Sequence, residues 1–71
     1  MTFPKRAIGK TGVATTELGL GGGPFGNLMA SMTNADAART LAGAWDAGIR
    51  YFDTAPVYGF GLSEHRVGAA F

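Results

Sequence analysis

The stretch Gly48–Gly68, GIRYFDTAPVYGFGLSEHRVG, decides the fold of this 71-residue chain. Residues Ile49–Phe52 form a short apolar and aromatic run after a glycine, which predicts a buried strand of a parallel sheet. Asp53 follows this strand directly, and Tyr58 comes five residues later in a segment that Pro56 and two glycines shape into a loop. A carboxyl at the C-terminal end of a parallel strand, followed by a phenol in the next loop, is typical of active sites in β/α proteins.

The same stretch resembles a known family. It contains the first signature of the aldo-keto reductases, G-x-R-x-x-D-T-A-x-x-Y-G-x-G-x-S-E. The matching positions are Gly48, Arg50, Asp53, Thr54, Ala55, Tyr58, Gly59, Gly61, Ser63, Glu64 and Gly68. The resemblance extends from about Arg6 to Phe71, and it is closest to the branch that oxidises free aldoses, of the threo-aldose, fucose or galactose type, or pyridoxal.

The resemblance implies an α/β fold, the (β/α)8 TIM barrel. Such a barrel takes roughly 250 residues. Residues 1–71 are therefore expected to form a truncated N-terminal part of one barrel domain: a hairpin, a strand–helix–strand unit joined by a right-handed crossover, and the start of a second helix. A chain of this size is marginally stable by itself, and without cysteine it has no disulfide to help.

The composition excludes several classes of protein. With 46% hydrophobic and 15% charged residues, the chain is built to form a core rather than to stay disordered. A net charge of +1 indicates neither a nucleic-acid partner nor an acidic surface. The first residues lack the apolar core of a signal peptide and no apolar run approaches the length of a membrane span, so we expect a cytoplasmic protein. One histidine and no cysteine predict no metal site. The oligomeric state is left open.

The N-terminal region predicts a β-hairpin. Two short, partly alternating runs, Lys5–Ile8 and Val13–Glu17, flank the loop Gly9–Gly12. By resemblance, this hairpin closes the N-terminal mouth of the barrel, opposite the active face. No catalytic role is therefore expected for its basic side chains, Lys5, Arg6 and Lys10.

A glycine-rich segment follows the first predicted barrel strand, Leu18–Gly21. Glycines at such a place mark a close approach to the backbone. The resemblance implies that Gly22 and Gly23 face the nicotinamide of a cofactor and that Phe25 walls the substrate pocket; a plain turn is the alternative. Family members often carry Thr or Ser at one of these two glycines, so no side-chain contact is predicted there.

Residues Gly21–Gly26 also fit G-x-G-x-x-G, the fingerprint of a Rossmann dinucleotide-binding domain, with Asp53 as the ribose-binding acid. In that fold the glycines open directly into a helix whose N-terminus holds the pyrophosphate. Here Asn27–Met32 intervenes before the expected helix cap, Thr33. Asp53 also follows Gly26 by 27 residues, where the fingerprint has about 20. The Rossmann domain is therefore a minor alternative.

Residues 33–47 show the clearest helical pattern. Thr33 can cap this helix, Asp36 occupies the capping-box position and Gly48 ends the helix. Trp45 lies on its apolar face and is expected in the core, packed on the sheet. The connection that precedes the helix is expected to lie over the active mouth, where it shapes the substrate pocket or only covers the barrel rim.

A second helix is expected to begin at Ser63, whose hydroxyl can cap it. Glu64 in its first turn is favoured by the helix dipole. His65 lies beyond the motif and is expected to be a surface or packing histidine.

The resemblance also implies a reaction. In aldo-keto reductases a hydride passes between the nicotinamide carbon and a carbonyl or alcohol, while a tyrosine moves the proton. By resemblance Tyr58 is the general acid/base and contacts the substrate, a small-molecule carbonyl or sugar. Asp53 is the supporting acid and contacts the cofactor, NADP or NAD. An ordinary phenol titrates near 10, about three units above neutral pH. In the family a lysine reduces this gap and a histidine orients the substrate, and both come from later strands.

Two functions from different classes remain. In the first, the parent protein is a nicotinamide-dependent oxidoreductase in which Asp53 and Tyr58 are half of the catalytic set. The 71 residues alone lack the lysine and the histidine and are expected to be inactive. In the second, the parent keeps the barrel as a non-catalytic subunit or binding protein. An acid and a phenol at this spacing favour the enzyme.

Overall fold

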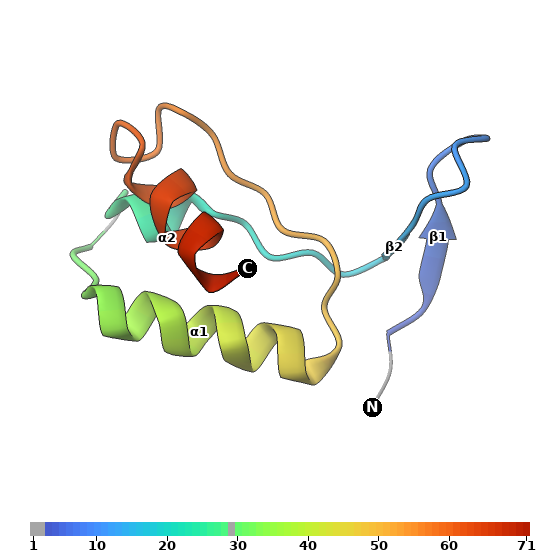
Figure 1. Cartoon of the computed structure of the whole chain (residues 1–71), viewed down its shortest axis with the longest axis horizontal. Coiled ribbons are helices and arrows are strands. Elements are labelled where there is room, and N and C mark those ends of the chain that lie inside the picture. The colour runs from blue at the N-terminus through green and yellow to red at the C-terminus, as the bar shows by residue number, and fades with distance from the viewer. Residues whose placement is uncertain (1–2, 29) are drawn as a thin grey trace.

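The computed structural model describes residues 3–28 and 30–71. The elements in chain order are β1 (Lys5–Ala7), β2 (Ala14–Thr16), the 3-10 helix η1 (Gly23–Gly26), α1 (Asn34–Ala47) and α2 (Leu62–Ala70). Helix α2 packs against both α1 and η1. Figure 1 shows these three helices grouped together, with the hairpin of β1 and β2 projecting at the opposite end of the molecule.

The predicted N-terminal hairpin is confirmed. Strand β1 pairs antiparallel with β2, with Arg6 opposite Thr15. The Ile8 N–H donates to the Val13 carbonyl at 2.8 Å and closes the loop. Two glycines of this loop adopt positive φ, which a residue without a Cβ does at little cost. Apart from the end of β2, the side chains of the hairpin are exposed.

One buried hydroxyl joins this hairpin to the rest of the chain. The Thr16 side chain is buried, and its Oγ1 donates to the Leu18 carbonyl at 2.6 Å and accepts from the Arg50 N–H at 2.9 Å. Because both bonds are made, the polar group is buried without an unpaired donor or acceptor. The Arg50 guanidinium in turn lies over the Trp45 ring, with Cζ 3.4 Å from the ring centroid.

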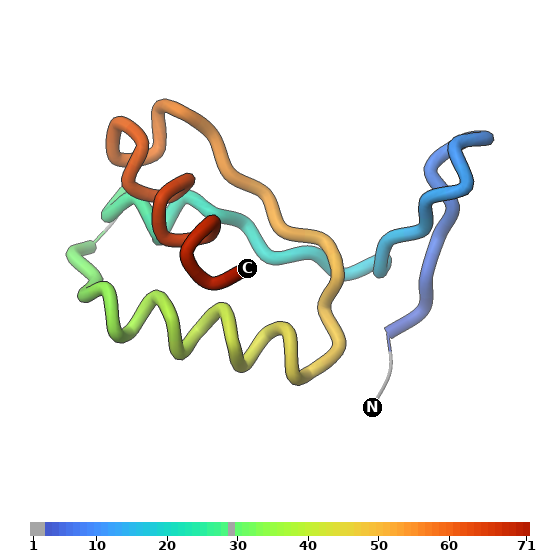
Figure 2. The backbone as a smooth tube through the Cα atoms, viewed as in Figure 1, coloured from blue at the N-terminus to red at the C-terminus, as the bar shows by residue number. Residues whose placement is uncertain are grey.

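The prediction of barrel strands at residues 18–21 and 49–52 is wrong for this chain, because neither segment forms a strand. The two segments lie side by side and parallel and pair over a single bridge, between Leu20 and Phe52. The Leu20 N–H donates to the Tyr51 carbonyl at 2.9 Å, and the Asp53 N–H donates to the Leu20 carbonyl at 3.1 Å. Figure 2 shows the two segments running next to each other. The expectation that the second strand is buried is wrong, since Tyr51 is 50% exposed. A parallel strand becomes buried only when further strands and helices cover it.

Helix α1 begins and ends where the sequence predicts. The Thr33 hydroxyl accepts from the Asp36 N–H at 3.1 Å and so caps one of the free amides of the first turn. Gly48 adopts a left-handed conformation with φ 106°, and its N–H donates to the last carbonyls of the helix. The Asp36 carboxylate pairs with Arg39 one turn later.

The core lies between η1, α1 and α2. Three buried side chains form it, with four partly buried ones packed around them: Phe25, Ala37 and Leu41, surrounded by Leu20, Met32, Phe52 and Val67. The prediction that Trp45 is buried is wrong, because its side chain is 44% exposed. Its ring instead packs in an aromatic group with Phe52 and Phe71, with centroid distances of 6.4 and 5.4 Å.

Helix α2 does not begin at Ser63 as predicted. It begins at Leu62, with Gly61 as N-cap at φ 99°. Ser63 is the second helical residue, and its side chain is completely buried. Its hydroxyl bonds to distant segments of the chain, which takes it away from the amides of its own helix. Glu64 lies in the first turn, as predicted. None of the helices within residues 3–28 and 30–71 is long and apolar enough to cross a membrane.

Candidate active site

The candidate site lies just beyond the parallel bridge, where the glycine-rich turn meets the loop that carries Tyr58. The bridge sets Asp53 beside this turn. The Gly22 N–H lies 3.5 Å from the Asp53 Oδ1, at the outer limit of a hydrogen bond. The Asp53 residue is exposed. Its carboxylate is therefore free to meet a ligand at the end of the strand.

Two glycines of the turn, Gly22 and Gly26, are required by contacts with this chain's own backbone. A Cβ on Gly22 would overlap the carbonyl oxygen of Asp53, and a Cβ on Gly26 would overlap the backbone of Tyr58 and Gly59. The sequence predicts a close approach to the backbone in this turn. For Gly22, the group that approaches is the Asp53 carbonyl. Both Gly22 and Gly23 are buried. Their contact with a nicotinamide stays a prediction.

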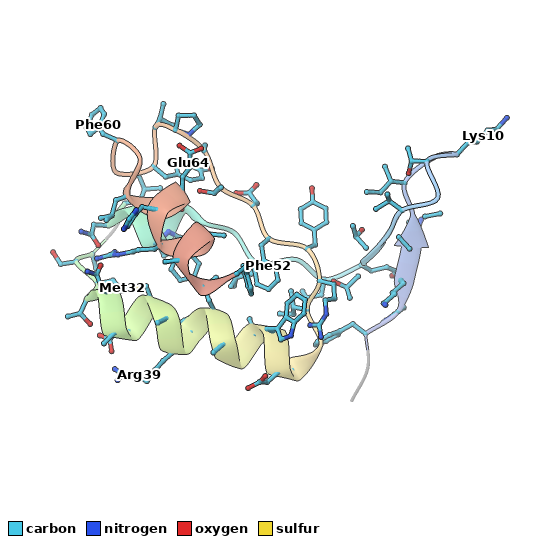
Figure 3. The ribbon with its side chains drawn as sticks, in the orientation of Figure 1. Lys10, Met32, Arg39, Phe52, Phe60 and Glu64 are labelled. Carbon is cyan, nitrogen blue, oxygen red and sulfur yellow. The ribbon has the colours of Figure 1, made fainter. Side chains whose placement is uncertain are left out.

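Main-chain bonds on both sides hold the Tyr58 loop. The Tyr58 N–H donates to the Ala55 carbonyl at 3.1 Å, and the Tyr58 carbonyl accepts from the Ser63 N–H at 3.2 Å. Tyr58 is half-buried. Further along the loop, Phe60 is 98% exposed and points out of the molecule (Figure 3). The 3-10 helix η1 thus has Asp53 at its N-terminal end and Tyr58 at its C-terminal end.

Phe25 is 2% exposed and packs in the core with Ala37 and Leu41. Its side chain therefore holds η1 against α1. The predicted contact between Phe25 and a substrate stays a prediction.

Sequence reasoning missed the role of two hydroxyls beside the site. The Ser63 Oγ donates to the Gly22 carbonyl at 2.7 Å and lies 2.7 Å from the Thr54 Oγ1. The sequence does contain a signal for the burial of Ser63. Ser63 and Val67 are four residues apart and therefore lie on the same, inward face of α2. A serine on the apolar face of a helix indicates a buried hydroxyl that needs a partner.

Sequence reasoning also missed Arg66, for which the pattern gives no signal. This half-buried side chain of α2 binds four positions between η1 and the start of α1. Its Nη1 donates to the Phe25 carbonyl at 3.0 Å and to the Asn27 Oδ1 at 3.1 Å. Its Nη2 donates to the Met32 carbonyl at 2.7 Å, and its Nε to the Asn34 Oδ1 at 2.9 Å. Arg66 therefore anchors the connection between η1 and α1.

Lys10 and His65 take no part in this arrangement. Lys10 is at the tip of the hairpin, at the opposite end of the molecule from Phe60 (Figure 3). His65 is exposed on α2, as predicted. In the ranges 3–28 and 30–71, the structure places no three His, Cys, Asp or Glu side chains so that they could hold a metal ion.

The chain has two parallel segments joined through a helix, and an acid and a phenol follow the second segment. This arrangement is that of part of a β/α protein. The model of the Aldo/keto reductase family matches residues 17–71. The chain belongs to the aldo/keto reductase family.

Sequence similarity to three dehydrogenases is consistent with this family. The chain is 55% identical over 64 residues to a pyridoxal 4-dehydrogenase of Microbacterium luteolum, a match that covers 90% of this chain and 19% of that protein. It is 48% identical over 69 residues to a D-threo-aldose 1-dehydrogenase of a Pseudomonas species (97% and 21%). It is 40% identical over 63 residues to an L-galactose dehydrogenase of Arabidopsis thaliana (89% and 20%). The chain thus spans about a fifth of the length of these relatives. No solved structure matches the chain significantly.

The glycine-rich segment does not have the turn-to-helix geometry of the Rossmann fingerprint, the minor alternative. The glycine-rich segment forms η1, which ends at Gly26, and α1 begins only at Asn34. The turn therefore does not open into the N-terminus of a helix that could hold a pyrophosphate. The match to the aldo/keto reductase family over residues 17–71 agrees with this conclusion.

Proposed function

We propose that this chain is the N-terminal part of a (β/α)8 barrel enzyme that transfers a hydride between NADP or NAD and an aldehyde, a ketone or an aldose-type alcohol. One observation carries the proposal. Asp53 and Tyr58, to which the resemblance assigns catalytic roles, lie on a loop whose backbone is held against the glycine-rich turn. Family membership and the similarity to dehydrogenases of pyridoxal and of aldoses support it.

The residues at the strand end fit a nicotinamide cofactor. The Asp53 carboxylate is exposed and accepts only a long contact from the Gly22 N–H, so it can accept bonds from the amide or hydroxyl groups of such a molecule. Gly22 and Gly23 belong to the turn beside this carboxylate, and in the proposal their backbone faces the nicotinamide. When bound, the cofactor supplies or takes up the hydride.

Tyr58 moves the proton in this proposal. Its hydroxyl gives a proton to the carbonyl oxygen during reduction and takes it from the alcohol during oxidation. Main-chain bonds of the Tyr58 N–H and carbonyl hold the backbone that carries the phenol, which lowers the cost of ordering this segment for the reaction. The lysine and the histidine that complete the set come from later parts of the barrel, so the 71 residues by themselves should show no turnover.

Replacing Tyr58 by Phe in the full-length protein tests the proposal. We expect kcat to fall by about 10²- to 10⁴-fold, because the general acid/base is lost while the ring is kept. The measurement is the absorbance of reduced nicotinamide with pyridoxal, D-threo-aldoses and L-galactose as trial substrates. Tyr51→Phe is the matched control, since it removes the hydroxyl of a half-exposed tyrosine two residues before Asp53. It should leave kcat unchanged.

Two results would contradict this function. One is a full-length protein that oxidises or reduces none of these substrates with either nicotinamide. The other is an active protein in which Tyr58→Phe and Tyr51→Phe behave alike. Binding of sugar or nicotinamide without turnover would favour the alternative of a non-catalytic barrel. A location in the cytoplasm stays a prediction.

A further inference from the structure

The buried hydroxyl of Ser63 lies where three segments of the chain meet. Ser63 has no exposed surface. Its Oγ donates to the Gly22 carbonyl at 2.7 Å and shares a hydrogen bond of the same length with the Thr54 Oγ1. Its N–H donates to the Tyr58 carbonyl at 3.2 Å. One residue of α2 thus binds the glycine-rich turn, the residue after Asp53, and Tyr58.

Backbone packing prevents the glycine-rich turn and the segment with Asp53 and Tyr58 from moving closer together. At one end of η1, Gly22 lies against the Asp53 carbonyl, and at the other end Gly26 lies against Tyr58 and Gly59. These contacts stop the two segments from coming closer, but contact alone does not stop them from separating. The bonds of Ser63 to Gly22, Thr54 and Tyr58 oppose this separation, together with the main-chain bond from Asp53 to the Leu20 carbonyl. Packing and hydrogen bonds together therefore fix the distance between the turn and the loop.

We propose that Ser63 is a positioning residue of the active site: through Gly22 and Thr54 it keeps Asp53 and Tyr58 aligned with the turn that faces the nicotinamide. This inference rests on the proposed function. Ser63 touches no reacting atom in this scheme and acts only through its neighbours. Loss of its hydroxyl should let the turn shift, and a misplacement of about 1 Å can cost about 100-fold in rate.

Ser63→Ala in the full-length protein tests this role. We expect kcat to fall about 10- to 100-fold, with the KM for substrate within about threefold of the parent value, because the bonds that Ser63 makes hold the proton-transfer group and not the substrate. Thr54→Val, which removes the partner hydroxyl and keeps the shape, should lower kcat in the same direction. Thr40→Val is the control: it removes an exposed hydroxyl that bonds only within α1, to the Asp36 carbonyl at 2.8 Å. It should change neither constant.

A second measurement does not depend on turnover. Amide hydrogen exchange in the full-length protein should become faster around Gly22 and Tyr58 in Ser63→Ala, and stay the same there in Thr40→Val. Unchanged exchange at these amides would overturn the positioning role whether or not the protein proves to be an oxidoreductase.

The kinetic outcomes separate the two proposals. If Tyr58→Phe abolishes turnover but folded Ser63→Ala keeps kcat within twofold, the positioning role fails and the function stands. If neither the parent nor any variant turns over, the function fails and exchange alone decides the positioning role. If Ser63→Ala does not fold, Thr54→Val decides. If both fail to fold, the hydroxyls serve folding rather than alignment, and the inference is wrong.

Discussion

Two regions of the molecule differ in the sequence separation of their hydrogen-bond partners. One is the hairpin of β1 and β2, and the other is the glycine-rich turn with the Tyr58 loop, where the candidate site lies. In the hairpin, partners lie close in sequence: Ile8 bonds to Val13, and Arg6 pairs with Glu17 on the surface. At the candidate site, partners lie far apart in the chain: Ser63 bonds to Gly22, 41 residues away. The hairpin is largely exposed, whereas the turn and Ser63 are buried.

This difference predicts where a substitution should lower the stability of the protein most. A local, exposed bond competes with water and can be replaced by it, so its net contribution is small. A buried contact between distant segments has no such replacement, and its loss leaves either an overlap or an unpaired polar group. The same chemical change should therefore cost much more at the site end than in the hairpin.

The largest expected effect is that of Gly22→Ala. The added methyl group would overlap the Asp53 carbonyl, so either the turn or the strand end must move. We expect the free energy of unfolding to fall by about 3 kcal/mol, measured by urea denaturation of the full-length protein. Gly21→Ala is the matched control, because a Cβ on the neighbouring glycine meets nothing within 4 Å. An equal loss in both variants would show that overlap with Asp53 is not what requires a glycine at Gly22.

Arg66→Met should have an intermediate effect. It removes the bonds to the Phe25 and Met32 carbonyls and keeps most of the side-chain volume. We expect a loss of about 2 kcal/mol in the free energy of unfolding. In Arg39→Met the lost arginine is 74% exposed and pairs only with Asp36, so the loss should stay below about 0.5 kcal/mol. Equal urea midpoints of the two variants would contradict the role of half-buried Arg66 as an anchor.

The smallest effect is expected in the hairpin, for Arg6→Gln. Arg6 pairs with Glu17 at 3.2 Å, with 78% of the arginine side chain exposed. We expect a loss of about 0.3 kcal/mol at low salt, vanishing at about 1 M salt because exposed charges are screened there. A loss as large as that of Arg66→Met, or one that persists in high salt, would mean that the hairpin is held by more than local bonds.

The correct predictions from sequence concern features that neighbouring residues determine. The hairpin follows from two alternating runs around a glycine loop. Helix α1 follows from Thr33 and Gly48, which bond to amides and carbonyls within one turn. The family signature at 48–68 is also local, and the match over residues 17–71 confirms it.

The errors concern residues whose surroundings are distant in sequence. Ser63 has the right chemistry and position for a helix cap, but the Gly22 carbonyl lies within reach and takes its hydroxyl. Trp45 has the period of a core residue, yet its ring stays 44% exposed in a small aromatic group. Arg66 gives no sign in the sequence that it binds the segment before α1.

The hairpin, the ends of α1 and the family could be predicted from the sequence, because each depends on residues within one turn, one loop or one signature. The groups that surround the candidate site became known from the folded chain. Folding brought the backbone of Asp53 against Gly22 and that of Tyr58 against Gly26, and it placed the Ser63 hydroxyl among them. The physical reason is that a close approach between segments about 30 to 40 residues apart depends on how the helices pack, and no local pattern records it.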